Sequence, residues 1–237
     1  RSGRRGVFYG VASQKQAARN GRRDATFDFG TNPCSEIILR PYQFCNLSEV
    51  VVRQTDSLQD LSRKVRIATI LGSLQATLTD FRYLRKVWQQ NTEEERLLGV
   101  SLTGIMDNPI LNNIHALEET LIFLRDTARE TNSNWAKVLG IPESAAITGV
   151  KPSGTVSKLV DASSGIHARH NDYYIRRIRM DKKDPMYGFL KDKGVEVEDD
   201  VRAPDTTAVF SFPMAAPAGA VLRNDRNALE QLDLWLL

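Results

Sequence analysis

The sequence lacks several features that would assign it directly to a class of protein. Only 2 of its 237 residues are cysteines, too few for a disulfide framework, which favours a reducing, cytoplasmic compartment. No apolar run approaches the roughly 18 residues of a membrane helix, and no apolar stretch follows the basic start, Arg1 to Arg5, as in a signal peptide. The net charge of +3 is small for the length. We therefore expect neither a membrane nor a nucleic acid as partner.

What is present is the composition of an ordinary folded protein, with 41% hydrophobic and 26% charged residues. The chain begins without Met, and residues 227–237 form a leucine-rich helical pattern without a cap or stop signal. No repeat or flexible linker interrupts the sequence. We therefore expect residues 1–237 to be an internal fragment of a longer chain, forming part of one domain with no second domain.

Hydrophobic periodicity predicts helices that alternate with short strands. Helices are predicted over residues 14–19 (ended by Asn20-Gly21), 57–84, 117–138 and 184–193, with others opening at a capping box in residues 92–95 and after Ser153. Strands are predicted over residues 37–39, 50–53, 145–150, 173–180 and 206–212. This alternation favours an α/β fold with largely parallel strand pairing.

Cys34 stands out because of its neighbours in Asn32-Pro33-Cys34-Ser35-Glu36. Proline biases the preceding residue toward extended geometry, and alternate side chains of an extended segment point the same way. Asn32, Cys34 and Glu36 are therefore predicted to present an amide, a thiol and a carboxylate to one ligand. The alternative is a buried thiol that packs as a small hydrophobe. A cysteine nucleophile needs a nearby histidine, and none is adjacent in sequence.

Cys45, the other cysteine, follows Cys34 by eleven residues. A hairpin would bring the two thiols together as a redox pair, while simple core packing is the alternative. A metal site is not expected, because the cysteines lack Cys-x-x-Cys spacing and His167 and His170 lack a third ligand.

The segment Lys151-Pro152-Ser153-Gly154-Thr155-Val156-Ser157 follows a predicted strand and opens a predicted helix. Free N–H groups at a helix start bind phosphate, although the segment is not a Walker A loop. The alternative is a capped turn without a ligand. Further along, Arg176, Arg177 and Arg179 either hold an anion or form a solvated, ion-paired strand face, which we favour for at least two of them.

Taken in order, these motifs resemble the large catalytic chain of ribonucleotide reductase. The resemblance rests on residues 32–37, 45–47, 96–104, 151–157, 164–167 and 173–177. The glycine of Pro152-Ser153-Gly154-Thr155 is similar to the adenosylcobalamin-dependent class II enzymes. The resemblance implies a ten-stranded α/β barrel with a cysteine-bearing finger loop, of which this chain supplies the central and later part.

The resemblance also implies a role for each motif. Cys34 would become a thiyl radical and abstract the 3′ hydrogen of the ribose, Glu36 would take the 3′-hydroxyl proton, and Asn32 would hydrogen-bond the ribose hydroxyls. Cys45 would be half of the reducing dithiol, its partner being absent from this chain. The substrate phosphates would be held by Pro152, Ser153, Gly154, Thr155, Val156 and Ser157.

The function implied is reduction of ribonucleotides to deoxyribonucleotides for DNA replication, with adenosylcobalamin as cofactor. A thioredoxin-like or glutaredoxin-like protein would be the reductant, in the cytoplasm of a bacterium or a virus-infected bacterial cell. Residues 205–214 look like the monomeric triphosphate type. The alternatives are a diphosphate reductase of class II or class I, and a non-catalytic nucleotide- or nucleic-acid-binding domain. We expect the isolated chain to be inactive.

Overall fold

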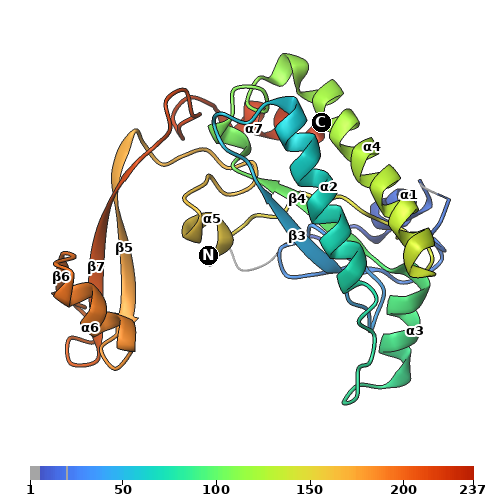
Figure 1. Cartoon of the computed structure of the whole chain (residues 1–237), viewed down its shortest axis with the longest axis horizontal. Coiled ribbons are helices and arrows are strands. Elements are labelled where there is room, and N and C mark those ends of the chain that lie inside the picture. The colour runs from blue at the N-terminus through green and yellow to red at the C-terminus, as the bar shows by residue number, and fades with distance from the viewer. Residues whose placement is uncertain (1–5, 20) are drawn as a thin grey trace.

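The computed structural model describes residues 6–19 and 21–237, so the basic start and Asn20 lie outside the described residues. Figure 1 shows a body of helices packed on a short sheet, from which a narrow arm extends. The body contains α1 (Gly10–Ala18), β1 (Gly30–Thr31), β2 (Ile38–Leu39), β3 (Asn46–Val51), α2 (Leu58–Gln75), α3 (Lys86–Glu95), β4 (Leu98–Thr103), a 3₁₀ turn (Ile105–Asp107), α4 (Ile114–Leu139), α5 (Val156–Leu159) and α7 (Ala228–Leu236). The arm contains β5 (Tyr173–Asp181), α6 (Pro185–Asp192), β6 (Val197–Asp199) and β7 (Thr207–Ala215).

The core of the body lies where α2 packs against the parallel pair β3 and β4, with α4 packed beside α2 (Figure 1). Leu61 and Val65 of α2 and Leu124 of α4 are buried there with Val50 and Val100 of the two strands. Each such side chain contributes about 1.5–3 kcal/mol to folding through burial. The helical periodicity predicted for α2 is confirmed in its first half, whose apolar side chains enter this core, whereas the leucines of its second half are exposed.

The predicted strand over residues 145–150 runs beside β4, although it forms only an isolated parallel bridge, Val100 to Thr148. Leu98 and Val100 donate backbone hydrogen bonds to the carbonyls of Ala146 and Ile147 at 2.9 and 2.8 Å. This segment leads directly into Lys151, so the sheet fixes where the phosphate-binding candidate begins.

Two helix predictions near α3 are wrong. The helix predicted over residues 57–84 starts correctly, with Ser57 and Asp60 forming a capping box, but it ends at Gln75. At this end, the side chain of Arg96 donates to the carbonyl of Ala76 at 2.5 Å and so satisfies one of the carbonyls that a helix end leaves free. The capping-box pattern at residues 92–95 does not open a helix: these residues end α3, and Arg96 stops it with a left-handed backbone (φ 45°).

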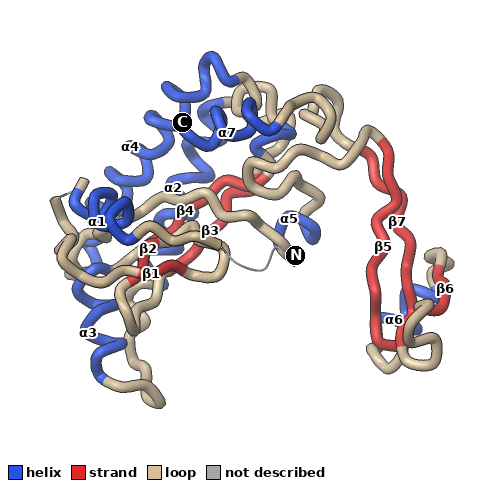
Figure 2. The backbone as a smooth tube through the Cα atoms, turned by 180° about the vertical axis from the view of Figure 1, so that it is seen from behind, coloured by secondary structure: helices blue, strands red, loops and turns tan. Residues whose placement is uncertain are grey.

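The expectation of largely parallel pairing is also wrong for the described residues. Only β3 and β4 form a parallel strand pair, whereas β1 pairs with β2, and β7 with both β5 and β6, in antiparallel register. In the arm, the chain runs from β5 through α6 and β6 to β7 without passing back through the body, so β7 pairs antiparallel with β5, as Figure 2 shows from behind. The final helix, predicted without a cap, is capped by Asn227 together with Glu230.

A buried ion-pair network holds the segment between α1 and β3 to the end of α3. Arg23 donates to both carboxylate oxygens of Glu95 at 2.9 and 2.8 Å, and Arg40 lies 3.0 Å from Oε1 of the same residue. Gln43 donates to Oε2 of Glu95 at 2.6 Å. The side chain of Glu95 is 1% exposed. These buried ion pairs therefore fix the position of the β1–β2 hairpin, and we call the network the base of the hairpin.

Candidate active site

Cys34 lies in the turn that connects β1 to β2. Ser35 has a left-handed backbone (φ 64°), and its N–H donates to the carbonyl of Asn32 at 2.9 Å. The predicted extended segment, with three side chains on one side, is therefore wrong. The chain must reverse because Thr31 pairs antiparallel with Ile38. The turn leaves the thiol of Cys34 exposed and free.

Asn32 closes this turn with one end of its amide. Its Oδ1 accepts from the backbone N–H of Ile37 at 3.1 Å. Its NH₂ group donates to no partner within the described residues. Asn32 thus orients the turn and keeps two donors available for a ligand.

Glu36 is the buried member of the predicted triplet, with a side chain that is 3% exposed. Its Oε1 lies 3.4 Å from the ammonium of Lys151, which joins the hairpin to the phosphate-binding candidate. Its Oε2 is buried and has no hydrogen-bond partner in the described part of the chain. An unsatisfied buried carboxylate oxygen is costly, which is typical of a group that awaits a donor from a ligand.

Cys45 lies just before β3 and is half buried. Burial raises the pKa of its thiol, the carboxylate of Glu36 raises it further, and Lys151 opposes the shift. Glu36, Cys45 and Lys151 therefore share one electrostatic environment. Both cysteines are free, so the dithiol role of Cys45 stays a prediction.

The turn of residues 152–157 has a buried side and an exposed side. Ser153 Oγ accepts from the N–H of Ser157 at 3.0 Å, and Ser157 Oγ donates to the carbonyl of Ser153 at 2.7 Å. Both serines are buried, whereas Gly154, Thr155 and Val156 are exposed. The N–H groups of Gly154 and Thr155 donate to no acceptor among the described residues. The helix that follows is short, Val156–Leu159.

The next loop supports this turn from behind. Gly165 has a left-handed backbone (φ 52°), and a Cβ there would lie 2.6 Å from the carbonyl oxygen of Lys151. Arg169 fixes the same loop, donating to both oxygens of Asp107 at 2.8 Å and to Asp161 at 2.8 Å. Sequence reasoning missed Lys151 and Arg169 as positioning residues. The only signal was the place of Lys151 directly before Pro152.

Glu36 and Ile37 also line a cavity of about 660 Å³, with α1 on one side and residues 143–148 on the other. Its lining includes Arg19, Arg22, Arg125 and Arg129. Among the described residues, no group of three or more His, Cys, Asp or Glu is placed to hold a metal ion. No helix in the described part is long and apolar enough to cross a bilayer.

Comparison with known proteins yields relatives of one kind. The chain is 32% identical over 208 residues to the adenosylcobalamin-dependent ribonucleoside-triphosphate reductase of Euglena gracilis, a match that covers 86% of this chain. It is 31% identical over 215 residues to the enzyme of the same name from Lactobacillus delbrueckii subsp. bulgaricus, covering 79% of this chain. No family model matches the chain.

The structure itself matches the crystal structure of a B12-dependent (class II) ribonucleotide reductase with a TM-score of 0.71. That match has 27% sequence identity and covers 86% of this chain and 32% of the other. It confirms the α/β class, while the ten-stranded barrel and the single-domain expectation stay predictions.

The chain spans about a quarter of the length of the curated relatives, 28% for both enzymes named above. The motifs and the comparisons agree on the relatives and on the class. Over the segment that they share, the chain is a homologue of the adenosylcobalamin-dependent (class II) ribonucleotide reductases.

Proposed function

We propose that this chain carries part of an active site that reduces ribonucleoside triphosphates to deoxyribonucleotides by radical chemistry. The observation that carries the proposal is the carboxylate of Glu36, which is buried, held on one oxygen by Lys151 and unpartnered on the other. A desolvated carboxylate with one free oxygen is suited to take a proton from a substrate hydroxyl. It stands two residues from an exposed free thiol.

In this proposal, the thiyl form of Cys34 abstracts the 3′ hydrogen of the ribose. Glu36 accepts the 3′-hydroxyl proton, which assists loss of the 2′-hydroxyl as water. The free NH₂ group of Asn32 donates to a ribose hydroxyl. Cys45 supplies one of the two thiol hydrogens that reduce the substrate, and the raised pKa of Cys45 keeps that hydrogen on the sulfur. No histidine base is needed, because a hydrogen atom and not a proton leaves the sulfur of Cys34.

The phosphates of the substrate would lie on the exposed side of residues 152–157. Gly154 and Thr155 offer free N–H groups, and open space surrounds Gly154. Ser153 and Ser157 hydrogen-bond each other and so shape the turn from its buried side. Because Lys151 contacts Glu36, the segment that would hold the phosphates is joined directly to the hairpin that would hold the ribose.

The described residues fit adenosylcobalamin as the radical source. The cofactor must reach a free thiol from outside the hairpin, and Cys34 is exposed and unpaired. When bound, adenosylcobalamin would supply the radical chemistry at this thiol. The contribution of the chain is to hold Cys34 on a fixed base beside Glu36.

The similar proteins are ribonucleoside-triphosphate reductases, which supports triphosphates over diphosphates as the substrate. They favour neither a class I enzyme nor a non-catalytic nucleic-acid-binding domain. Of the three β5 arginines that could hold the anionic backbone of a nucleic acid, two are paired, Arg177 with Glu198 and Arg179 with Asp200 at 2.6 Å. We propose a thioredoxin-like or glutaredoxin-like reductant and a reducing, cytoplasmic compartment, in keeping with two free cysteines.

Alkylation of the cysteines in the 237-residue chain tests the substrate site. We expect iodoacetamide to react faster with exposed Cys34 than with Cys45, whose pKa is raised by burial. A ribonucleoside triphosphate should slow the reaction at Cys34, and the Gly154→Glu variant should lose this protection because it places negative charge on the open turn. The proposal fails if the triphosphate leaves the rate at Cys34 unchanged.

A further inference from the structure

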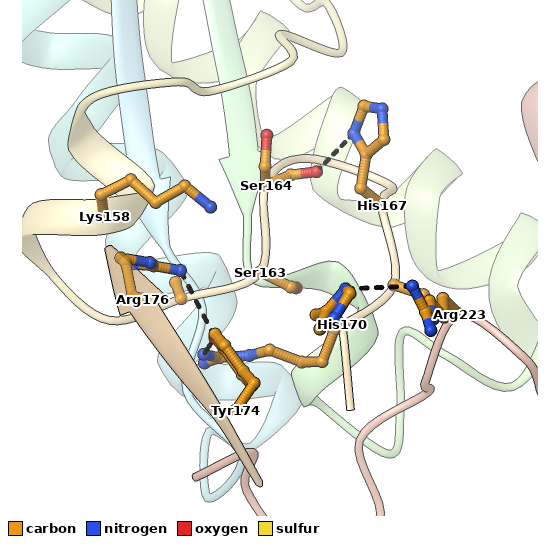
Figure 3. Close-up of a pocket in the computed structure, with 11 residues that line it drawn as sticks. Lys158, Ser163, Ser164, His167, His170, Tyr174, Arg176 and Arg223 are labelled. Atoms are coloured by element: carbon orange, nitrogen blue, oxygen red, sulfur yellow. Dashed lines mark hydrogen bonds between the residues drawn. The ribbon is translucent and has the colours of Figure 1, made fainter. Parts of the chain in front are cut away.

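A second basic cavity, of about 360 Å³, lies between the loop of residues 162–170 and the start of β5 (Figure 3). This size falls at the lower end of small-molecule pockets. None of the described residues that line it is an aspartate or a glutamate. The polar lining is dominated by Lys158, Ser163, His170, Tyr174, Arg176 and Arg223. We call this cavity the basic pocket.

The positive charge of the basic pocket is largely uncompensated. Arg169, at its back, is neutralised by Asp107 and Asp161. Lys158, Arg176 and Arg223 form no ion pair within the described residues. Burial lowers the pKa of Lys158, and the charges of Arg176 and Arg169 lower it further. Even with both carboxylates counted, the four cations leave an excess of positive charge at the pocket, an arrangement that an anion stabilises.

The basic pocket also holds hydroxyl donors that the protein does not use. Ser163 is 3% exposed, and its Oγ has no hydrogen-bond partner among the described residues. The hydroxyl oxygen of Tyr174 accepts from Arg169 at 3.4 Å and from Arg176 at 3.3 Å, which leaves its hydrogen to donate. Figure 3 shows both side chains directed at the cavity. A buried hydroxyl without a partner is rare in folded proteins.

The backbone fixes these donors in place. Arg169 donates its N–H to the carbonyl of Val221, and Arg223 donates to the carbonyl of Arg169, both at 2.9 Å. The side chain of Arg223 lies 3.4 Å from Nδ1 of His170, to which it donates. Guanidinium and ammonium groups thus converge from three separate segments, residues 158, 176 and 223.

We propose that the basic pocket binds a phosphoryl group, either free phosphate or the terminal phosphate of a nucleotide. A tetrahedral oxyanion accepts hydrogen bonds from several directions, which matches donors from three segments and two hydroxyls. Arginine forks pair well with phosphate oxygens, and a dianion balances most of the charge of Lys158, Arg176 and Arg223.

This site goes beyond the proposed active site and is separate from the turn of residues 152–157. None of residues 152–157 lines the basic pocket, although Lys158 follows the turn directly. The ligands of the two sites can therefore be tested with different variants.

Calorimetric titration of the 237-residue chain with inorganic pyrophosphate tests the proposal, with ATP as a second ligand that tells a nucleotide from free phosphate. Losing one charged hydrogen-bond donor is expected to weaken binding about tenfold or more in Arg176→Gln and Arg223→Gln. Arg177→Gln is the matched control, because Arg177 is the next residue of β5 and is paired with Glu198. This control should bind like the wild type.

Gly154→Glu separates the basic pocket from the turn: it should remove only the pyrophosphate that the turn binds and keep the binding component that Arg176→Gln and Arg223→Gln lose. Far-UV circular dichroism checks that each variant folds, and Lys158→Gln replaces any arginine variant that does not. Three results would overturn the proposal: no pyrophosphate binding to the wild type, equal loss in Arg177→Gln, or a loss in Gly154→Glu that matches the arginine variants. None of these depends on whether a triphosphate protects Cys34, so the two proposals fail independently.

Discussion

The base and the tip of the β1–β2 hairpin differ in almost every physical property. At the base, Arg23, Arg40 and Glu95 form a desolvated ion network. At the tip, Cys34 is exposed and makes no bond to the other cysteine. The turn of residues 152–157 repeats this division, with buried serines behind exposed amides. The comparison teaches that buried polar groups set the geometry, while Cys34 and the free amides of the turn lie on the accessible side; Glu36 is the exception, a buried group with one unpartnered oxygen.

The largest expected effect is at the base. Glu95→Ala removes the carboxylate that both buried arginines share, and breaking such a pair typically costs about 3–5 kcal/mol. Glu94→Ala is the matched control, because Glu94 also pairs with Arg40 but its side chain is 63% exposed. This control should cost at most about 1 kcal/mol. Urea unfolding measures both, and equal losses would contradict the proposed role of the network.

A smaller effect is expected at the turn. Ser153→Ala removes the hydroxyl that accepts from Ser157, which should cost about 1 kcal/mol of unfolding free energy. Thr155→Ala should change the unfolding free energy by less than about 0.5 kcal/mol, since the threonine is exposed, but it should weaken triphosphate binding. Urea unfolding with a nucleotide titration checks both. The division is refuted if Ser153→Ala is neutral and Thr155→Ala destabilises.

The next effect is a change in the pKa of Cys45, which depends on the charges of two neighbouring side chains. Glu36 raises the pKa of Cys45 and Lys151 lowers it. Glu36→Gln should therefore lower the pKa of Cys45, giving more thiolate and alkylation a few times faster near pH 8. Lys151→Met should raise the pKa and slow the reaction. Alkylation rates measured against pH test the signs, and shifts in the same direction for both variants would show that the three groups are not coupled.

The smallest effect is expected at the tip. Cys34→Ala should change the unfolding free energy by less than about 0.5 kcal/mol, because the thiol is exposed and contributes little to packing. A chemical denaturation curve that superimposes on that of the wild type is the expected result. A loss of several kcal/mol would mean that Cys34 is a packing residue, the alternative raised by the sequence.

The sequence singles out candidate site residues, which stay predictions, and it locates the long helices, but it predicts the local structure less well. Cys34, Glu36 and Cys45 are singled out by their motifs, and periodicity locates α2 and α4 because each buries apolar side chains on one face. Local rules fail where distant partners decide. The acidic run at residues 92–95 looks like a helix start, yet Glu95 binds arginines far away in sequence.

The same limit applies to the turn at Cys34 and to the basic pocket. Proline favours an extended neighbour, but antiparallel pairing of Thr31 with Ile38 forces a reversal. The sequence shows Arg176 among three similar arginines, and only the fold separates it from Arg177 and Arg179, which have acidic partners. Tertiary contacts decide the shape of the turn and the partners of the arginines, and motif spacing does not encode these contacts.

Electron spin resonance tests the central assignment, that Cys34 is the radical cysteine, most directly. The sample is the complete protein that contains this segment, frozen rapidly after mixing with adenosylcobalamin, a reductant and a ribonucleoside triphosphate. We predict a thiyl signal that Cys34→Ser abolishes and that Cys45→Ser retains. A signal that survives Cys34→Ser, or that disappears only in Cys45→Ser, would contradict the account.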